Sequence, residues 1–210
     1  MRSSDAGELS KCLPYAVLTG LSIFAGIAVA IHFLQPDFHP ATATLSMYVL
    51  GRFGWLVSAG FSILAVSLLL LSAGLYRHFQ RSRLSGLPHI LFFVVTAGVF
   101  LVAIFPTDLP GQNWSVAGTL HQAGAYLIFY LFPFMAYGFA RNFENSPLWQ
   151  AIYLPAFLIF VGYTGLLIAA LTLLEIFGVN IHLGVIQRIL IGFILAWMYL
   201  ITGRLLHIIS

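Results

Sequence analysis

The chain has 210 residues, of which 60% are hydrophobic and 7% are charged, and its formal net charge is +3. Its mean hydropathy of +0.98 excludes a soluble protein of this length, because a soluble fold could not hide that much apolar surface from water. The positive charge is small and dispersed, which argues against nucleic acid as a partner. We therefore expect an integral membrane protein surrounded by lipids.

Six apolar runs are long enough to cross a bilayer core of about 30 Å as helices, which takes about 20 residues each. The strand-like alternation of apolar and polar residues that a barrel would need is absent. The predicted spans are residues 14–34, 54–76, 88–105, 116–140, 153–174 and 184–206. Because the connections are short and none has the composition of a linker, we expect one all-α domain of six transmembrane helices over residues 1–210.

Basic residues are concentrated on one side of the predicted bundle. Seven of the nine lie before the first span, in the second and fourth connections or at the end of the sixth span: Arg2, Lys11, Arg77, Arg81, Arg83, Arg141 and Arg204. The positive-inside rule makes this side cytoplasmic, so both termini are expected in the cytoplasm. A cleaved signal peptide is the alternative for the first span, but its apolar run is longer than a typical signal-peptide core.

Polar residues gather on the other, outer side. They lie in the connections after the first, third and fifth spans, or at the start of the spans that follow. The candidates for a ligand-binding or buried polar cluster are Ser46, Arg52, Trp55, Asp108, His121, Glu175, Gln187 and Arg188.

Four of these candidates are charged and lie at the disfavoured ends of their helices. Arg52 and Arg188 lie at helix N-termini, and Asp108 and Glu175 follow helix C-termini, each at a cost of about 0.3 to 1 kcal/mol where exposed. We therefore predict ion pairs between the arginines and the carboxylates. Such pairs could simply join helix ends. The neighbouring hydrogen-bonding side chains favour instead a polar pocket that is open to the outer side.

His121 is the best single candidate for chemistry. The positive end of its predicted helix favours the neutral imidazole, which can accept a proton or bind a metal. A histidine that merely satisfies its hydrogen bonds at the interface is the alternative. Asp108 lies 13 residues earlier across a turn-rich loop, so the two side chains could form an acid/base pair. No zinc-ligand spacing occurs, and we expect neither a metal nor another cofactor.

Glycines and prolines indicate how the spans pack. Small residues such as Gly60, Gly162 and Gly192 predict close approach between helices. Pro133 and Pro155 predict kinks in the fourth and fifth spans.

Four short motifs occur in order along the chain. They are SMYVLGRFGW at 46–55, FPTD at 105–108, HQAGA at 121–125, and GVIQR at 184–188 followed by Trp197. Together they resemble the bacterial family called domain of unknown function 998. The resemblance covers nearly the whole chain and implies a six-span protein of the bacterial inner membrane without an agreed activity. It also implies that six residues are characteristic of the family pattern: Phe105, Pro106, Asp108, His121, Gln187 and Arg188.

Three functions remain open from the sequence. The leading hypothesis is an inner-membrane protein that binds a small amphipathic or lipidic ligand in an outward-facing polar pocket. In it Arg52 and Arg188 hold an anionic head group. The second is a membrane hydrolase or transferase that uses His121 and Asp108. The third is an accessory subunit of a membrane complex, with purely structural ion pairs. A homo-oligomer is compatible with each of them.

Overall fold

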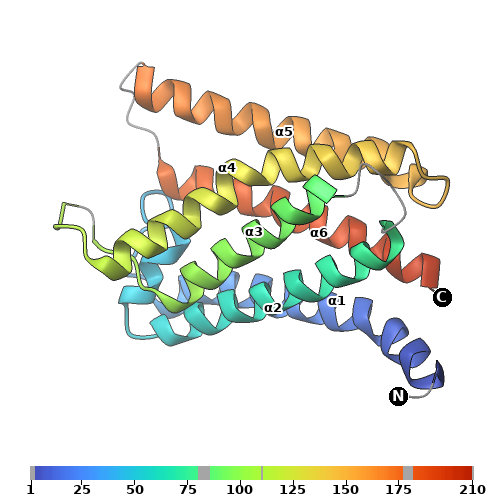
Figure 1. Ribbon diagram of the computed structural model, residues 1–210. Helices are drawn as coiled ribbons and strands as arrows, with labels where there is room; N and C mark the ends of the chain where they lie inside the picture. The colour runs from blue at the N-terminus through green and yellow to red at the C-terminus, as the bar shows by residue number, and fades with distance from the viewer. Residues whose placement is uncertain (1–2, 80–85, 110, 177–181, 210) are drawn as a thin grey trace.

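The computed structural model describes residues 3–79, 86–109, 111–176 and 182–209, and within these ranges it contains helices and no strand (Figure 1). The long helices are α1 (Ser3–Leu34), α2 (Gly54–Phe79), α3 (Gly86–Ile104), α4 (Val116–Glu144), α5 (Tyr153–Leu171) and α6 (Leu183–Ile209). The short turns are the 3₁₀ turns η1 (Leu45–Leu50) and η2 (Gln150–Ile152) and the π turn η3 (Thr172–Ile176). The predicted all-α fold is confirmed, and six helices are long and apolar enough to cross a membrane.

The predicted span boundaries agree with the helices to within a few residues at most ends. The largest difference is at α1, which begins at Ser3 rather than at residue 14 and carries Pro14 in its interior. The kink predicted at Pro155 is not required. This residue is the third of α5, and a proline in the first turn of a helix leaves no intrahelical hydrogen bond unmade.

Each helix packs against the next along the chain, and α6 closes the bundle by packing against α1. Both termini lie at one end of the bundle, which we call the terminal end (Figure 1). The turn η1 and the connection between α3 and α4 lie at the opposite end, which we call the loop end (Figure 1). Arg2, Arg81 and Arg83, on which the expected orientation partly depends, lie outside the described residues.

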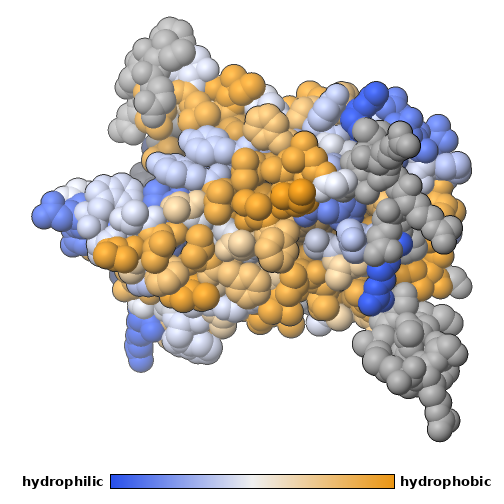
Figure 2. Space-filling model, in the orientation of Figure 1, coloured by the Kyte–Doolittle hydropathy of each residue, from blue (hydrophilic) through white to orange (hydrophobic). Residues whose placement is uncertain are grey.

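On the face shown in Figure 2, apolar side chains cover most of the middle of the bundle, and hydrophilic residues lie mainly toward its two ends. Phe33 and Val116 are 81% and 80% exposed. Such exposure would be costly in water but suits contact with lipid chains. The core is aromatic as well as aliphatic, since Phe92, Phe132 and Phe139 each pack a ring against the fully buried Trp197.

The helices α3 and α4 make an unusually close crossing. A Cβ atom built at Gly98 would lie 2.8 Å from the carbonyl oxygen of Gly124, and one built at Gly124 would lie 2.7 Å from the carbonyl oxygen of Gly98. Only glycine fits at both positions, because neither backbone carbonyl can move aside. The same close approach through small residues is common between membrane helices.

A tyrosine from α5 compensates for the proline inside α4. Pro133 has no N–H and cannot donate to the carbonyl of Phe129 four residues earlier. The hydroxyl of Tyr163 donates to that carbonyl oxygen at 2.9 Å, and the Tyr163 side chain is fully buried. Because a free carbonyl is costly in an apolar interior, this hydrogen bond fixes α5 to α4 at mid-bundle.

Candidate functional site

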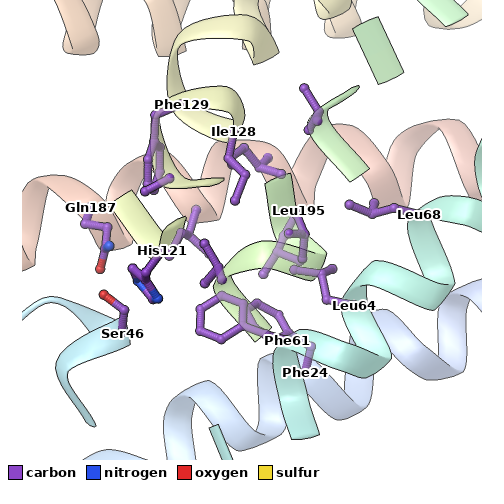
Figure 3. A pocket seen from close by; sticks show the side chains of 16 residues that line it. Phe24, Ser46, Phe61, Leu64, Leu68, His121, Ile128, Phe129, Gln187 and Leu195 are labelled. Atoms are coloured by element: carbon purple, nitrogen blue, oxygen red, sulfur yellow. The ribbon is translucent and has the colours of Figure 1, made fainter. Parts of the chain in front are cut away.

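Three polar side chains from three different elements meet at the loop end of the bundle interior. His121 comes from the second turn of α4, Ser46 from η1, and Gln187 from the second turn of α6. Figure 3 shows them together at one end of a cavity whose other walls are apolar. His121 is 2% exposed and Ser46 is 7% exposed, so the group is largely buried. We call these three residues the polar cap.

The polar cap keeps hydrogen-bonding capacity for another molecule. The Nδ1 atom of His121 lies 2.7 Å from the carbonyl oxygen of Phe105. A carbonyl only accepts, so Nδ1 carries the proton, and Nε2 of the neutral ring is left as an acceptor. The Oε1 atom of Gln187 accepts from the backbone N–H of Leu45 at 2.6 Å, which leaves the Nε2 amide as a donor. Ser46 exchanges a hydrogen bond with the Thr44 hydroxyl at 3.2 Å.

The polar cap is shared by two spaces that differ in shape. The first is a narrow apolar cavity of about 50 Å³ that extends into the bundle past Phe61 and Leu68. The second is a wider pocket of about 290 Å³ between α4, α5 and α6. Ala125 and Phe129 also line both spaces. The two spaces thus lie against the same five residues, and together we call them the cap pocket.

The divergence of α5 from α4 creates the wider part of the cap pocket. The two helices pack together through Tyr163 near mid-bundle and separate toward the loop end (Figure 1). Ala170 and Leu171 of α5 and Leu190 of α6 line the space between them. The side walls are thus mainly apolar.

The described residues that line the cap pocket include no Asp, Glu, Lys or Arg. Within the described parts of the chain, no group of three or more His, Cys, Asp and Glu side chains could hold a metal ion. What this site offers a ligand is therefore hydrogen bonds at one end and apolar contact elsewhere.

Arg188 does not lie at the cap pocket, although it follows Gln187 in the chain. Successive residues of a helix point about 100° apart, and Arg188 faces the other side of α6, against α1. Its Nε atom donates to Nε2 of His32 at 2.8 Å, and its Nη1 atom donates to the carbonyl oxygens of Ala43 and Gly184, each at 2.8 Å. The sequence-predicted group is thus divided between the two sides of α6.

Arg52 and Trp55 lie away from both sides. The Arg52 side chain is exposed, and its guanidinium carbon lies 5.5 Å from the ring centre of Phe53. Trp55 is 69% exposed, as expected of an aromatic residue near a membrane interface. Neither residue lines the cap pocket.

Asp108 stabilises the start of α4 rather than pairing with an arginine. Its carboxylate accepts hydrogen bonds from the backbone N–H and the hydroxyl of Ser115, each at 2.8 Å. Ser115 is the N-cap of α4 and accepts from the N–H of Gly118. The carboxylate also lies near the positive end of the α4 dipole, which favours its charge. Asp108 makes no hydrogen bond to His121, whose Nδ1 atom is engaged with the backbone instead.

The predicted ion pairs of the arginines with Asp108 are therefore wrong. Among the described residues the one ion pair joins Arg141 and Glu144 on α4 at the terminal end. Glu175 is in the π turn η3, and its side chain lies outside the described residues.

Two residues outside the predicted site, Gln35 and Tyr48, are important for the loop end. The amide of Gln35 donates to the carbonyl oxygen of Tyr48 at 3.0 Å, and the Tyr48 hydroxyl donates to the carbonyl oxygen of Phe38 at 2.8 Å. Burial raises the pKa of Tyr48, and the nearby positive charge of Arg188 acts in the opposite direction. These contacts hold the connection from α1 to α2 against the bundle. In the sequence, the position of the polar residue Gln35 directly after an apolar span was the signal that could have identified this contact.

The fold defines a multi-pass membrane protein with a partly polar internal site at one end. The family described as "Protein of unknown function (DUF998)" matches residues 17–204 of the chain. The chain belongs to this family, since the match covers most of its length, and the resemblance noted from the sequence is confirmed. No curated protein and no solved structure matches the chain.

Proposed function

We propose that this protein binds a small amphipathic or lipidic molecule in the cap pocket. The observation that carries the proposal is a pair of adjoining cavities that share three polar side chains at one end, two of them buried and one half-buried, and have mainly apolar walls elsewhere. A volume of about 290 Å³ for the wider part is close to the lower limit of ordinary ligand pockets, which is about 300 Å³. An apolar tail would occupy the walls and a polar head would meet the polar cap.

The head group is expected to be uncharged. Nε2 of His121 offers an acceptor, the Nε2 amide of Gln187 offers a donor, and the Ser46 hydroxyl offers both. No charged side chain of the described lining could neutralise an ionic head group, and burying an unpaired charge is costly. A hydroxyl or amide head group, which can both donate and accept, satisfies these three residues. The anionic head group suggested by Arg52 and Arg188 is not proposed for this pocket.

Filling the wide part of the pocket is expected to abolish ligand binding. Ala170→Phe places a ring in the pocket, because the small side chain of Ala170 is a buried part of its lining. Ala169→Phe is the matched control, since Ala169 is the adjacent residue of α5 and is exposed on its outer face. Native mass spectrometry of the gently purified proteins measures the retained molecule. We expect a bound species in the wild type and in Ala169→Phe, and its loss in Ala170→Phe.

Equal retention in the two variants would contradict the proposal, as would a wild-type protein without any bound species after mild extraction.

Gln187→Glu is a second test of the proposal and examines the polar cap. It keeps an oxygen for the N–H of Leu45 and removes the amide donor. Gln187→Glu should therefore weaken binding while the loop end stays folded. The control for this variant is Gln150→Glu, because Gln150 is exposed at the terminal end.

The hydrolase or transferase hypothesis gains no support from a contact between its two residues, because Asp108 is bonded to Ser115 and His121 to Phe105. No observation favours the accessory-subunit hypothesis.

We also propose that the chain forms one domain in a bacterial inner membrane, with the terminal end in the cytoplasm and the cap pocket toward the outer side. The single cysteine, Cys12, is exposed near the terminal end and serves as a natural reporter. A membrane-impermeant maleimide added to intact spheroplasts should leave Cys12 unlabelled until the membrane is permeabilised. It should label Asp37→Cys at the loop end, in a Cys12→Ser background, without permeabilisation. The reverse pattern would place the cap pocket on the cytoplasmic side.

A further inference from the structure

Arg188 is held rigidly where α1, α6 and the connection before η1 meet. Its Nε and Nη1 atoms donate three hydrogen bonds, to His32 and to the backbone carbonyls of Ala43 and Gly184. The remaining nitrogen, Nη2, is buried and has no hydrogen-bond partner among the described residues. A guanidinium has five N–H donors, so both hydrogens on Nη2 are left without an acceptor in the part of the chain that the structure describes.

The positive charge of Arg188 also has no counter-charge among the described side chains, which do not include that of Glu175. No described carboxylate lies within ion-pair distance of it. All three groups that accept its hydrogen bonds are formally neutral, and the ring of Tyr48, whose centre lies 5.7 Å from the guanidinium carbon, adds only a weak attraction. A partly buried cation near lipid is costly unless an anion is close to it. An anion in the space beside Arg188 would offset this cost.

The space beside Arg188 is an apolar groove between α1 and α6 with a volume of about 430 Å³. Its lining includes Ala28, Val29, His32, Phe33, Gly192 and Leu195. Val29 and Phe33 are 62% and 81% exposed on the outer surface of the bundle, so the groove opens sideways toward lipid rather than toward the cap pocket. Arg188 stands about 8 Å from the start of α6 at a rise of 1.5 Å per residue, in the second turn from the loop end of a helix that is long and apolar enough to cross a membrane.

We propose that the groove between α1 and α6 is a binding site for an anionic phospholipid, whose phosphate is held by Arg188 and whose acyl chain lies along the groove. Charge complementarity supports the phosphate, because a hydrogen bond from a charged guanidinium, here from Nη2, to a phosphate oxygen is stronger than one between neutral groups. The apolar walls support a lipid rather than a free anion, since an inorganic phosphate would leave them uncovered. Because Nη2 is buried, the side chains that cover it move aside on binding, and a phosphate oxygen then accepts its hydrogen bonds. This site is separate from the cap pocket and does not depend on the function proposed for it.

Gly192→Leu tests the groove without changing Arg188. A Cβ atom built at Gly192 meets nothing within 4 Å, so the larger side chain fills the groove and leaves the three hydrogen bonds of Arg188 intact. Gly203→Leu is the matched control, because Gly203 is also exposed on α6, has open space around it and does not line the groove. Native mass spectrometry in micelles measures binding of added phosphatidylglycerol, with phosphatidylcholine as the net-neutral comparison.

We expect the wild type and Gly203→Leu to bind phosphatidylglycerol at least about tenfold more tightly than phosphatidylcholine, and Gly192→Leu to lose this preference. Arg188→Gln should also lose it. Arg52→Gln, which removes an exposed arginine at the same end, should keep it. If Arg188→Gln does not fold, the lipid preference of Gly192→Leu alone tests the proposal. An undiminished preference in Gly192→Leu, or its absence in the wild type, would overturn the proposal. Competition by millimolar inorganic phosphate alone would overturn the assignment to a lipid.

Ala170→Phe separates this proposal from the one made for the cap pocket. It should leave the preference for phosphatidylglycerol unchanged, because Ala170 does not line the groove. Loss of the preference in Ala170→Phe but not in Gly192→Leu would place the anionic lipid in the cap pocket and overturn the groove as its site.

Discussion

Gly124→Val is expected to destabilise the protein by about 3 kcal/mol, at the upper end of the range for overpacking. A Cβ atom at this position would lie 2.7 Å from the carbonyl oxygen of Gly98 and 2.8 Å from the Cβ atom of Leu101. Relief would require α3 and α4 to move apart, because the closest atom belongs to the backbone. Equilibrium unfolding with increasing SDS in mixed micelles, followed by tryptophan fluorescence, measures the change.

Gly165→Val is the control for this prediction. Gly165 lies on α5, and a Cβ atom built there meets nothing within 4 Å. Both variants add the same branched side chain to a membrane helix, so they share any intrinsic effect on the helix. A loss of similar size in the two variants would show that the crossing of α3 and α4 is not the cause.

The six helices could be predicted because one physical requirement dominates the sequence. Each span must be apolar over about 20 residues because it crosses the hydrocarbon core of the bilayer. The residues between these spans are then the polar connections. The start of α2 at Gly54 and of α4 at Val116 were predicted at the correct residues. The close crossing at Gly98 and Gly124 could not be predicted, because glycines are frequent in this chain and the sequence does not show which two of them face each other.

The predicted ion pairs with Asp108 failed for a physical reason. The prediction assumed that a charge at the disfavoured end of one helix is paired with an opposite charge from the end of another helix. Asp108 is instead stabilised by Ser115 at the N-terminus of the following helix, and Arg188 by backbone carbonyls and His32. Backbone groups are strong hydrogen-bonding partners at every residue, but which of them a loop presents to a side chain depends on the fold. The sequence identified the unusual residues and misidentified their partners.

The sequence indicated the polar cap better than the rest of the site. Ser46, His121 and Gln187 were all selected because polar residues near apolar spans are unusual, and the structure brings these three together. Arg52 and Trp55 were selected on the same ground and face outward. The shape of the cap pocket was not predictable, because it arises where α5 diverges from α4 between Tyr163 and the loop end. A small residue such as Ala170 acquires its place in the site only from that packing.

The position of α6 explains why one cluster in the sequence becomes two sites in the fold. Its second turn lies between α1 on one side and the space between α4 and α5 on the other. Gln187 faces the second of these and Arg188 the first. This separation keeps the positive charge out of the cap pocket. Variants at the two residues should therefore affect different ligands.

Tyr163→Phe is expected to cost about 1 to 3 kcal/mol, the usual penalty for a buried polar group that loses its hydrogen-bond partner. The variant keeps the ring, and with it the contact to Phe132, and removes only the hydroxyl that donates to Phe129. Because this hydrogen bond joins α5 to α4 at the inner limit of the cap pocket, ligand retention should fall with stability. Tyr137→Phe is the control, since Tyr137 packs against Phe160 between the same two helices but is 45% exposed.

Adding Pro133→Ala tests the cause of this loss. The alanine supplies the backbone N–H that the proline lacks, so α4 can satisfy the carbonyl of Phe129 by itself. In this background Tyr163→Phe should cost at least about 1 kcal/mol less than in the wild type, because the carbonyl is no longer left without a donor. The same SDS unfolding experiment measures all four proteins of the cycle. An unchanged cost would mean that Tyr163 acts through its packing alone and that the missing N–H of Pro133 is satisfied in another way.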